Sequence, residues 1–589
     1  MVDLKARPFY LSEEDCKWVE DTIAGMSDEE KVGQLFFQLT SSHEEEHLKE
    51  LMEKYHLGGC RYNPAPGAAI LEQNRTLQKY AKIPVFIACN TEAGGDGACA
   101  DGTSIGAGVK IGATGKEEYA FALGKMANEE AAALGCNMAF SPVCDIAYNW
   151  ENTEIINRAF GNDPERVARM SAEYLKGAHT IPGFACAAKH FPGNGQDFRD
   201  AHISNNVNYF DVKEWDATYG MVYRTLIEQD LDAIMGGHIM MPKYAKALNP
   251  ALKDEDMMPA TLNPEIMTGL LREKLGFNGM VVTDASHMVA MTNRMKRKEM
   301  LPLAINAGCD MFLFFNDPEE DFHTMLNAYR EGIISEERMT EALYRILGLK
   351  AHMGLHRKAK EELAPAADAL KETLGKEEYK EMQKAISNDA ITLVKYKDKE
   401  VLPVTPDRYP RIMIVHIKGG NSAMGELMKA MGYGGGTNPA ELLKEKLCTK
   451  GFEAFIYESP LDVMKQQIAA GEKPDVNLYF AGKNAIADFL KDMDLVITLC
   501  DVPGGRPSFG MSKGGGEIPW YVFELPVIVV GCGQPTMLAD IPQARTYINT
   551  YDGKESTLNA LVEKLMSGEE AFHGIDPIDS FCGVFDARL

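Results

Sequence analysis

The sequence of 589 residues predicts a (β/α)8 TIM-type barrel followed by a second α/β layered domain. Short apolar runs alternate with stretches of helical periodicity over about the first 320 residues. Several of these runs end in carboxylates, histidines or a lysine. The composition changes after Leu355, and a second series of apolar runs follows. A chain of this length exceeds one ordinary hydrophobic core, so we expect two or three domains.

The first series consists of eight runs whose apolar character is continuous, which is typical of strands buried on both faces. They lie at 33–39, 57–62, 84–90, 138–146, 184–191, 233–240, 279–285 and 308–315. The segments between them are rich in Ala, Leu, Glu and Lys and predict helices. Eight strands alternating with helices are expected for a (β/α)8 barrel, although a doubly wound open sheet would give a similar pattern.

Polar side chains at the carboxyl ends of these runs favour the barrel. They are Asn90, Glu92, Asp145, Lys189, His190, His238, Asp284 and Asn316. In a barrel all such ends converge on one face, where the active site lies. A single polar strand end needs no function, because strands end in loops and loops are polar. So many charged ends together predict a catalytic face.

The second half of the chain predicts a separate domain. We expect a barrel over 1–355, a charged helical linker over 356–389 and a C-terminal α/β sandwich domain over 390–589. The strands expected after the linker lie at 391–396, 411–419, 452–459, 494–501 and 525–533. Two glycine-rich stretches, 432–437 and 512–517, lack the spacing of a nucleotide-binding loop and are interpreted as surface loops.

The composition argues against several classes of partner. Lys and Arg number 61 against 86 Asp and Glu, and the net charge of −25 makes nucleic acid and membranes poor partners. The N-terminus shows no apolar signal region, and no run has the length of a membrane span. The twelve cysteines include no CxxC pair, and several lie in apolar runs. These features predict a cytoplasmic protein, and they indicate no oligomeric state.

Four motifs carry a specific resemblance. AAKHFPGNGQDFRDAH at 187–202 resembles the KHFPGHG…DSH signature of family-3 glycoside hydrolases, in their β-N-acetylglucosaminidase branch. The stretches at 83–95, 141–168 and 276–288 are similar to further blocks of that family and follow its order. The resemblance continues, more loosely, into the second domain. It implies a retaining exo-β-N-acetylhexosaminidase that removes terminal GlcNAc or GalNAc from an oligosaccharide or glycoside, with no cofactor and no metal.

The resemblance also implies the catalytic residues. It assigns the nucleophile to Asp284 and the acid/base to His202, with Asp200 orienting the imidazole. Retention needs a carboxylate nucleophile and an acid that later acts as a base. Asp200 and His202 lie two residues apart, so their side chains can meet in an extended chain and the carboxylate can stabilise the imidazolium. Structural alternatives are a helix cap at Asp284 and a pair that only orders its loop.

The resemblance extends to residues that bind substrate. It implies that Arg158, Lys189 and His190 hold sugar hydroxyls, and we add Asn90, Asn194 and His238 as candidate substrate-binding residues. Arg158 could instead form a structural ion pair, and His238 could be a buried histidine with satisfied hydrogen bonds. Asn90 stands where the family usually has an aspartate, and Asn194 where it has a second histidine. Because Asn90 lacks the charge of aspartate, the choice between GlcNAc and GalNAc stays open.

Other functions fit the sequence less well. A family-3 β-glucosidase or β-xylosidase typically takes its acid/base glutamate from outside this loop. A histidine base leaves less negative charge near the site, so phosphate could replace water and make the enzyme a β-N-acetylglucosaminide phosphorylase. A non-catalytic sugar-binding protein would need none of the three catalytic side chains in register. A metal-dependent hydrolase is disfavoured, because His190 and His202 already have roles.

Overall fold

The computed structural model describes residues 2–40, 42–418, 438–458, 460–474, 491–502, 524–579, 581, 583, 586 and 588. The glycine-rich stretches at 432–437 and 512–517 lie outside the described residues. The chain divides into two compact units. The first comprises Met1–Gly108, Lys116–Tyr148 and Arg158–Met382, and the second Val109–Gly115, Asn149–Asn157 and Gln383–Leu589. The boundaries predicted at 355 and 390 stay predictions.

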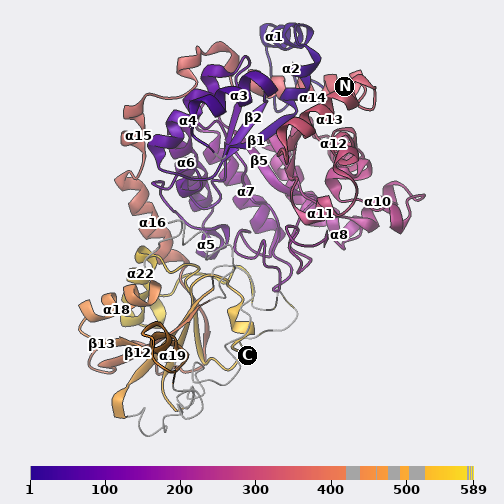
Figure 1. Ribbon diagram of the computed structural model, residues 1–589. Helices are drawn as coiled ribbons and strands as arrows, with labels where there is room; N and C mark the ends of the chain where they lie inside the picture. The colour runs from indigo at the N-terminus through magenta and orange to yellow at the C-terminus, as the bar shows by residue number, and fades with distance from the viewer. Residues whose placement is uncertain are drawn as a thin grey trace. The chain divides into compact units, whose positions relative to one another are not determined.

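The first unit is built on a closed barrel of eight parallel strands (Figure 1). Their order around the barrel is β1-β10-β9-β7-β5-β4-β3-β2. The strands are β1 (Phe36–Thr40), β2 (Gly59–Tyr62), β3 (Phe86–Cys89), β4 (Met138–Ala139), β5 (Ala185–Phe191), β7 (Ala233–Gly236), β9 (Met280–Ala285) and β10 (Met311–Leu313). Each overlaps one predicted apolar run, so the predicted (β/α)8 barrel is confirmed. A separate small sheet pairs β6 (Asn206–Val207) with β8 (Ile239–Met240).

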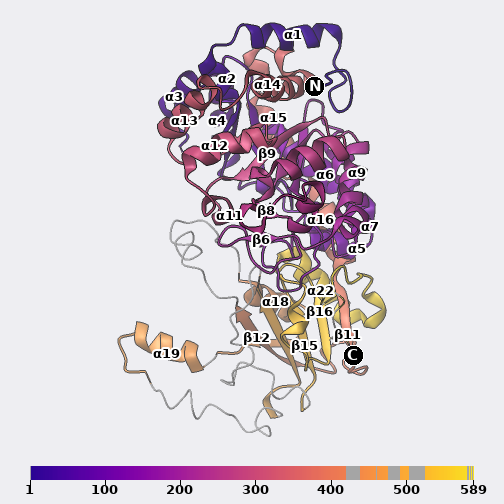
Figure 2. The same ribbon diagram turned by 90° about the vertical axis from the view of Figure 1, so that its right-hand side faces the viewer.

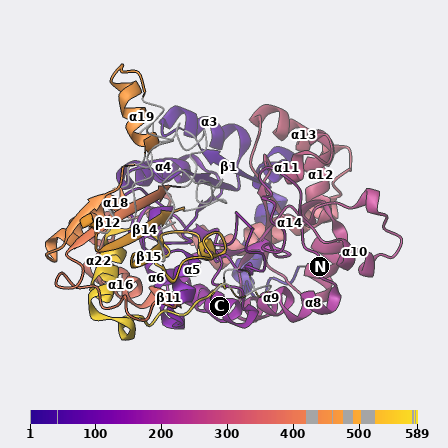
Figure 3. The ribbon, with the colours of Figure 1, turned by 90° about the horizontal axis from the view of Figure 1, so that it is seen from below.

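Helices between the strands surround this barrel, with α4 and α6 across it from α12 and α13 (Figures 1 and 3). The longer ones are α3 (Glu45–Tyr55), α4 (Gly67–Tyr80), α6 (Glu117–Ala133), α7 (Pro164–Ala178), α9 (Tyr219–Glu228), α12 (Arg297–Ala307), α13 (Pro318–Arg330) and α14 (Glu336–His352). Several begin at clear sequence signals. Asp163 and Asp317 cap α7 and α13, each followed by a proline at the first helical position, and Ser335 caps α14.

Other helices complete the unit. They are α1 (Glu13–Ala24), α2 (Asp28–Gln34), α8 (Val212–Ala217), α10 (Pro242–Leu248), α11 (Val289–Thr292) and a π-helix, Glu265–Lys274. The segment predicted as a helical linker contains α15 (Ala367–Thr373) and most of α16 (Glu377–Ala390). Among the described residues, no helix combines the length and apolarity needed to cross a bilayer.

The second unit contains a six-stranded sheet (Figure 2). Its order is β11-β16-β15-β14-β12-β13, and only the β11–β16 pair is antiparallel. The strands are β11 (Thr392–Tyr396), β12 (Arg411–Lys418), β13 (Glu453–Ile456), β14 (Leu495–Asp501), β15 (Val527–Gly531) and β16 (Thr546–Asn549). The first five match predicted runs, whereas β16 was not predicted, because TYIN is short and half polar.

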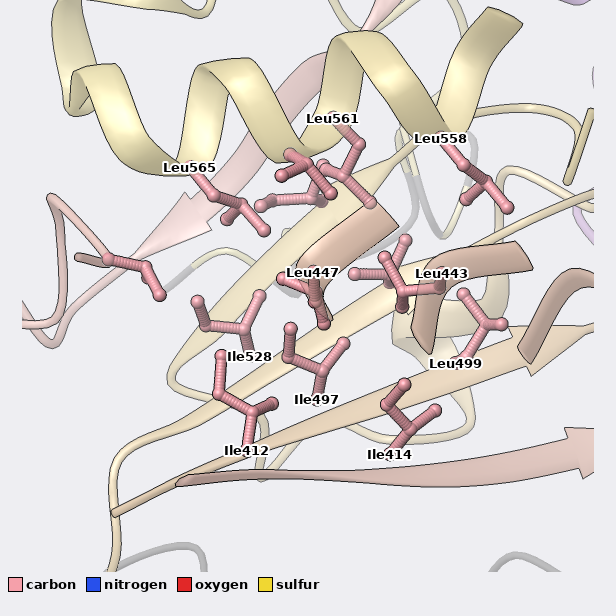
Figure 4. Close-up of a cluster of buried hydrophobic side chains, with 14 of the residues drawn as sticks. Ile412, Ile414, Leu443, Leu447, Ile497, Leu499, Ile528, Leu558, Leu561 and Leu565 are labelled. Carbon is pink, nitrogen blue, oxygen red and sulfur yellow. The ribbon is translucent and has the colours of Figure 1, made fainter. Parts of the chain in front are cut away.

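Helices α18 (Pro439–Thr449) and α22 (Glu555–Ser567) cover one face of this sheet (Figure 4). Ile412 and Ile414 of β12 point toward them, as do Ile497 and Leu499 of β14. Residues two apart lie on the same face of a strand, which explains this spacing. The intervening side chains, such as Val496, belong to a second apolar cluster. Both faces of the sheet are therefore buried, as the continuous apolar runs predict.

A segment from the first half of the sequence lies inside the second unit. Helix α5 (Gly108–Thr114) carries Lys110, whose side chain is only 2% exposed. Its ammonium lies 2.8 Å from Asp552 Oδ2 and also donates to the hydroxyls of Ser387 and Thr557. Burial lowers the pKa of Lys110, and Asp552 opposes this effect. Residues 109–115 are thus an integral part of this unit.

Candidate active site

The centre of the candidate site is Asp284, near the carboxyl end of β9. The strand MVVTDA is buried over its first four residues, so the backbone holds Asp284 rigidly while its side chain is 16% exposed. The Ala285 N–H donates to Asp284 Oδ1 over 2.7 Å. Burial would raise the pKa of Asp284, but His190, His238 and this N–H outweigh it and hold the pKa below its usual value. The carboxylate is therefore ionised, as a nucleophile requires.

A buried pair of residues, His190 and Asp145, lies next to Asp284. His190 Nε2 of β5 lies 4.0 Å from Asp284 Oδ2, and His190 Nδ1 lies 2.7 Å from Asp145 Oδ2. Asp145 follows β4 and is fully buried. Because an ionised carboxylate only accepts hydrogen bonds, Asp145 fixes the proton of His190 on Nδ1. The second oxygen of Asp145 accepts from the N–H groups of His190 and Asn194.

A second charge cluster gathers around Glu92, which follows β3. Arg158 donates to both oxygens of Glu92 over 2.8 and 2.9 Å, and Lys189 Nζ lies 2.5 Å from Oε1. Burial would raise the pKa of Glu92, but the charges of Arg158 and Lys189 hold it far below its usual value. Burial lowers the pKa of Lys189, which Glu92 counteracts. Both predicted sugar-binding cations therefore share one carboxylate that sequence reasoning left without a role.

The predicted acid/base pair forms in the structure. His202 Nδ1 and the His202 N–H each lie 2.8 Å from Asp200 Oδ1. The imidazole is 52% exposed, whereas Asp200 is 25% exposed. Burial would raise the pKa of Asp200, but its bonds to His202 and the charge of Arg158 lower it. Asp200 is thus ionised, and it stabilises the protonated form of His202.

The loop that carries this pair is held by buried polar residues. Asp197, 1% exposed, accepts hydrogen bonds from the backbone N–H and the guanidinium of Arg199 and from the Val207 N–H. Asn194, 2% exposed, accepts from its neighbour's N–H and from Asn206. The structure therefore places Asn194 beneath the loop as a buried support. Its predicted contact with sugar stays a prediction.

Asn90 and His238 occupy different environments at the mouth of the barrel, the end at which the carboxyl ends of its strands lie. Asn90 directly follows β3 and is partly buried, and its side-chain amide has no hydrogen-bond partner among the described residues. His238 is 1% exposed. Its Nε2 donates to the Ala285 carbonyl over 3.1 Å, and its Nδ1 accepts from the Thr261 hydroxyl over 2.8 Å. The geometry of His238 is that of the satisfied buried histidine, and it fixes the backbone next to Asp284.

The charge of Asp284 also acts on two residues that sequence reasoning did not single out, Arg61 and His287. Arg61 lies on β2, and its pKa, lowered by burial, is raised by the charges of Glu92 and Asp284. His287 lies three residues after Asp284, and burial lowers its pKa, an effect that the charge of His202 reinforces and that of Asp284 opposes. The position of Arg61 near a strand end was the available signal. Nothing in the loop sequence marks His287.

A short zinc-type spacing also occurs outside the site. Residues 43–47 read HEEEH, which fits the HExxH spacing. Helix α3 begins only at Glu45, so His43 and His47 do not share a helix face. Among the described residues, neither histidine belongs to a group of three side chains able to hold one ion. This segment gives no support for a metal site.

Comparison with known proteins places this geometry in a family context. Residues 27–349 match the model described as the glycosyl hydrolase family 3 N terminal domain. The chain is 35% identical over 593 residues to the "Beta-N-acetylglucosaminidase/beta-glucosidase" of Cellulomonas fimi, with 100% of both chains covered. It is 28% identical over 381 residues to "Beta-hexosaminidase A" of Pseudoalteromonas piscicida, covering 61% of this chain and 62% of that one.

Solved structures resemble the whole chain. The "Beta-glucoside phosphorylase BglX" matches with a TM-score of 0.88 at 34% identity, covering 99% of each chain. A family-3 β-N-acetylglucosaminidase from Paenibacillus sp. matches with a TM-score of 0.76 at 23% identity, covering 95% of this chain and 100% of that one. The second likeness bears on the fold alone.

Proposed function

Because the chain belongs to glycosyl hydrolase family 3, we propose that it is a retaining exo-β-N-acetylhexosaminidase acting on terminal β-linked GlcNAc or GalNAc. The observation that carries this proposal is the Asp200–His202 pair, at 2.8 Å, on the same mouth as the ionised Asp284. A nucleophilic carboxylate and a group that alternates between acid and base are what retention requires. The names of the Cellulomonas and Pseudoalteromonas relatives support the acetylated sugar.

The reaction would proceed in two displacements. In the first, an Asp284 oxygen attacks the anomeric carbon while His202 donates a proton to the departing glycosidic oxygen. The products are a glycosyl ester on Asp284 and the free aglycone. In the second, neutral His202 accepts a proton from water as the water oxygen attacks the same carbon. The ester bond breaks, and Asp284 leaves as a carboxylate.

The charged residues around Asp284 would bind the sugar. Glu92 holds Arg158 and Lys189 in fixed positions, so these cations need no reorganisation to meet sugar hydroxyls. Asn90 offers both a donor and an acceptor that no described side chain satisfies. Asn90 is therefore our candidate for the residue that distinguishes sugar epimers.

A panel of p-nitrophenyl β-glycosides tests this proposal. We expect the N-acetylglucosaminide or the N-acetylgalactosaminide to be cleaved with a higher kcat/KM than the glucoside and the xyloside. Asn90→Asp should change the ratio of kcat/KM between the two acetylated epimers more than it changes the sum of the two kcat/KM values. A preference for the glucoside or xyloside would contradict the hexosaminidase assignment and favour a β-glucosidase, an activity that the name of the Cellulomonas relative also prints.

Phosphorolysis is a second candidate function. It is favoured by the 34% identity to a β-glucoside phosphorylase over 99% of both chains. It is also favoured by the acid/base, because a neutral imidazole repels an anion less than a free glutamate would. Inorganic phosphate should then accelerate turnover and yield a sugar 1-phosphate. Turnover and products that do not change with phosphate would eliminate this candidate.

We further propose a cytoplasmic location. Each cysteine that the structure describes is a free thiol, and most are buried. Thiols persist in a reducing compartment, whereas an oxidising compartment would favour oxidation of the exposed Cys448. Cell fractionation with an antibody tests the location, and recovery from the medium or the envelope would contradict it.

A further inference from the structure

The loop that carries the acid/base histidine lies against the segment that follows the nucleophile. We call this loop, residues 192–205 between β5 and β6, the acid/base loop. The Val289 N–H donates to the His202 carbonyl over 3.2 Å. The next N–H, that of Ala290, donates to the Ala201 carbonyl over 3.1 Å. The backbone of the histidine itself is therefore bonded to the chain that continues from the nucleophile strand.

These two bonds take the place of a capping side chain on α11 (Val289–Thr292). The first N–H groups of a helix have no acceptor within the helix. In α11 they belong to Val289 and Ala290, and the preceding residue, Met288, has no side-chain oxygen to accept them. The carbonyls of the acid/base loop cap the helix instead, so that the helix and the loop hold each other.

Side chains reinforce this backbone contact. Ala201, Met288 and Ala290 are each at most 2% exposed and pack together in a small apolar cluster. At the end of the acid/base loop, Asn293 Nδ2 donates to Asn205 Oδ1 over 2.9 Å. The loop is thus joined to α11 by backbone bonds, by apolar packing and by a side-chain bond.

The other end of the same segment is anchored to the barrel beside the nucleophile. Directly after Asp284, the Ala285 carbonyl accepts from the Met288 N–H. The Ser286 hydroxyl donates to the Phe314 carbonyl, just beyond β10, over 2.8 Å. One short segment therefore fixes its own start against the barrel and holds the acid/base loop at its end.

The imidazole follows the position of its backbone. Both the N–H and the Nδ1 of His202 lie 2.8 Å from Asp200 Oδ1, which ties the ring to the loop that carries it. Catalytic groups must be placed accurately, because a displacement of about 1 Å can cost about a hundredfold in rate. Whatever fixes the backbone of His202 therefore fixes the point from which its proton is delivered.

We propose that α11 and Asn293 clasp the acid/base loop and thereby position His202 relative to Asp284. This inference rests on the proposed role of His202 as acid/base. Asn293 and Ala290 are positioning residues in this account, since each acts on the proton transfer through the loop.

The test compares a substrate that needs acid assistance with one that does not. The ratio of kcat/KM for a dinitrophenyl β-glycoside to kcat/KM for an alkyl β-glycoside of the same sugar is measured in each variant. Dinitrophenolate departs without a proton, whereas an alkoxide needs one from His202. Because both rates come from the same folded enzyme, the ratio does not depend on the fraction that is folded.

Two variants loosen the clasp in different ways. Asn293→Ala removes an exposed bond and should raise the ratio about threefold to tenfold, the factor that one neutral hydrogen bond contributes. Ala290→Leu adds methyl groups to a packed cluster and displaces the loop, so it should raise the ratio at least about tenfold.

A double-mutant cycle and a matched control locate the effect. Asn205→Ala should raise the ratio as much as Asn293→Ala, and the double variant should raise it no further, because both remove one bond. Asn306→Ala removes another exposed asparagine bond, 2.8 Å long, from the last turn of α12 to the Ile333 carbonyl. This control should keep the wild-type ratio.

The outcomes separate this inference from the proposed function. A ratio within about twofold of wild type in Asn293→Ala or in Ala290→Leu would overturn the clasp. His202→Ala should raise the ratio more than either variant, whatever the fate of the clasp. An unchanged ratio in His202→Ala would overturn the acid/base assignment, and the clasp with it.

Discussion

At the scale of single residues, the ionisation of Asp284 depends indirectly on a second, fully buried carboxylate, that of Asp145. Asp145 is fully buried and orients His190, which in turn faces Asp284 at 4.0 Å. In Asp145→Asn the amide removes the charge and offers His190 a donor as readily as an acceptor. We expect kcat/KM to fall about tenfold to a hundredfold, the cost of a broken buried hydrogen bond of about 1–3 kcal/mol.

A matched control exists at another strand of the same barrel. Asp232 is 2% exposed and pairs with His179 over 2.8 Å, away from the mouth. Asp232→Asn should lower thermal stability and yet keep kcat/KM within a few-fold of wild type. Equal losses of kcat/KM in the two variants would show that Asp145 acts only through stability.

The contribution of His202 to the rate should depend on the leaving group. His202→Ala removes acid assistance, so the rate on natural disaccharides or alkyl glycosides should fall far more than the rate on nitrophenyl glycosides. The reason is that nitrophenolate departs without a proton. The measurement is kcat/KM for aryl glycosides whose phenol leaving groups differ in pKa. In the variant, kcat/KM should depend more steeply on this pKa than in wild type. An equal loss across the series would make His202 a positioning residue.

Sequence alone predicted the catalytic and sugar-binding candidates but not how they pair. Arg158 and Glu92 are 66 positions apart, and they meet because β3 pairs with β4, whose following loop carries Arg158. Asp145 and Glu92 were recognised as polar strand ends, but their roles depend on side-chain contacts that no spacing reveals. Both ring nitrogens of His238 are hydrogen-bonded within the fold, which its position at a strand end does not reveal.

At the scale of elements, helix α14 carries a buried charge at Lys350. Its ammonium donates to Gln34 Oε1 over 2.6 Å and lies 5.0 Å from the ring centroid of Phe86. Burial lowers the pKa of Lys350 from 10.5 to about 7. Between these values the unfolded chain binds a proton that the folded chain does not, so the free energy of unfolding rises with pH.

The change is measurable below the range where thiols ionise. From about pH 6 to about pH 7.5, Lys350 should add about 1 kcal/mol to the free energy of unfolding. Thermal midpoints across this range should rise in wild type and be flatter in Lys350→Met, which keeps the packing volume but does not titrate. Parallel pH profiles for the two proteins would contradict the low pKa.

The elements that could be predicted share one physical property. Strands buried on both faces need continuous apolarity, and that signal marked all eight barrel strands and five of the second sheet. It failed at β16, where TYIN contributes Tyr547 and Ile548 to the core between two polar residues. The π-helix at Glu265–Lys274 also left no signal, because its apolar spacing resembles that of an α-helix.

At the scale of the whole molecule, the second unit depends on chain from both halves of the sequence. Lys110 and Asp552 are 442 positions apart and form a buried ion pair. Asp552→Ala would leave the ammonium of Lys110 uncompensated, which costs about 3–5 kcal/mol. We expect a marked fall in the thermal midpoint, with much of it restored by the double variant Lys110→Met/Asp552→Ala. No restoration in the double variant would show that Asp552 acts through other contacts.

This pairing also shows where prediction from sequence ends. The change of composition after Leu355 indicated two domains, and the second sheet followed from its apolar runs. The assignment of residues 109–115 to the second unit could not be predicted, because GVKIGAT reads as an ordinary helix of the barrel half. Its buried lysine binds partners that are distant in sequence.

The central claim is that Asp284 forms a covalent bond to the sugar. Incubation with a slow 2-deoxy-2-fluoroglycosyl fluoride, followed by intact mass measurement and peptide mapping, tests it most directly. The predicted result is a single glycosyl adduct on the peptide from β9, located on Asp284 and absent in Asp284→Asn. An adduct on Glu92 or Asp145, or turnover without any adduct and with inverted product, would contradict the account.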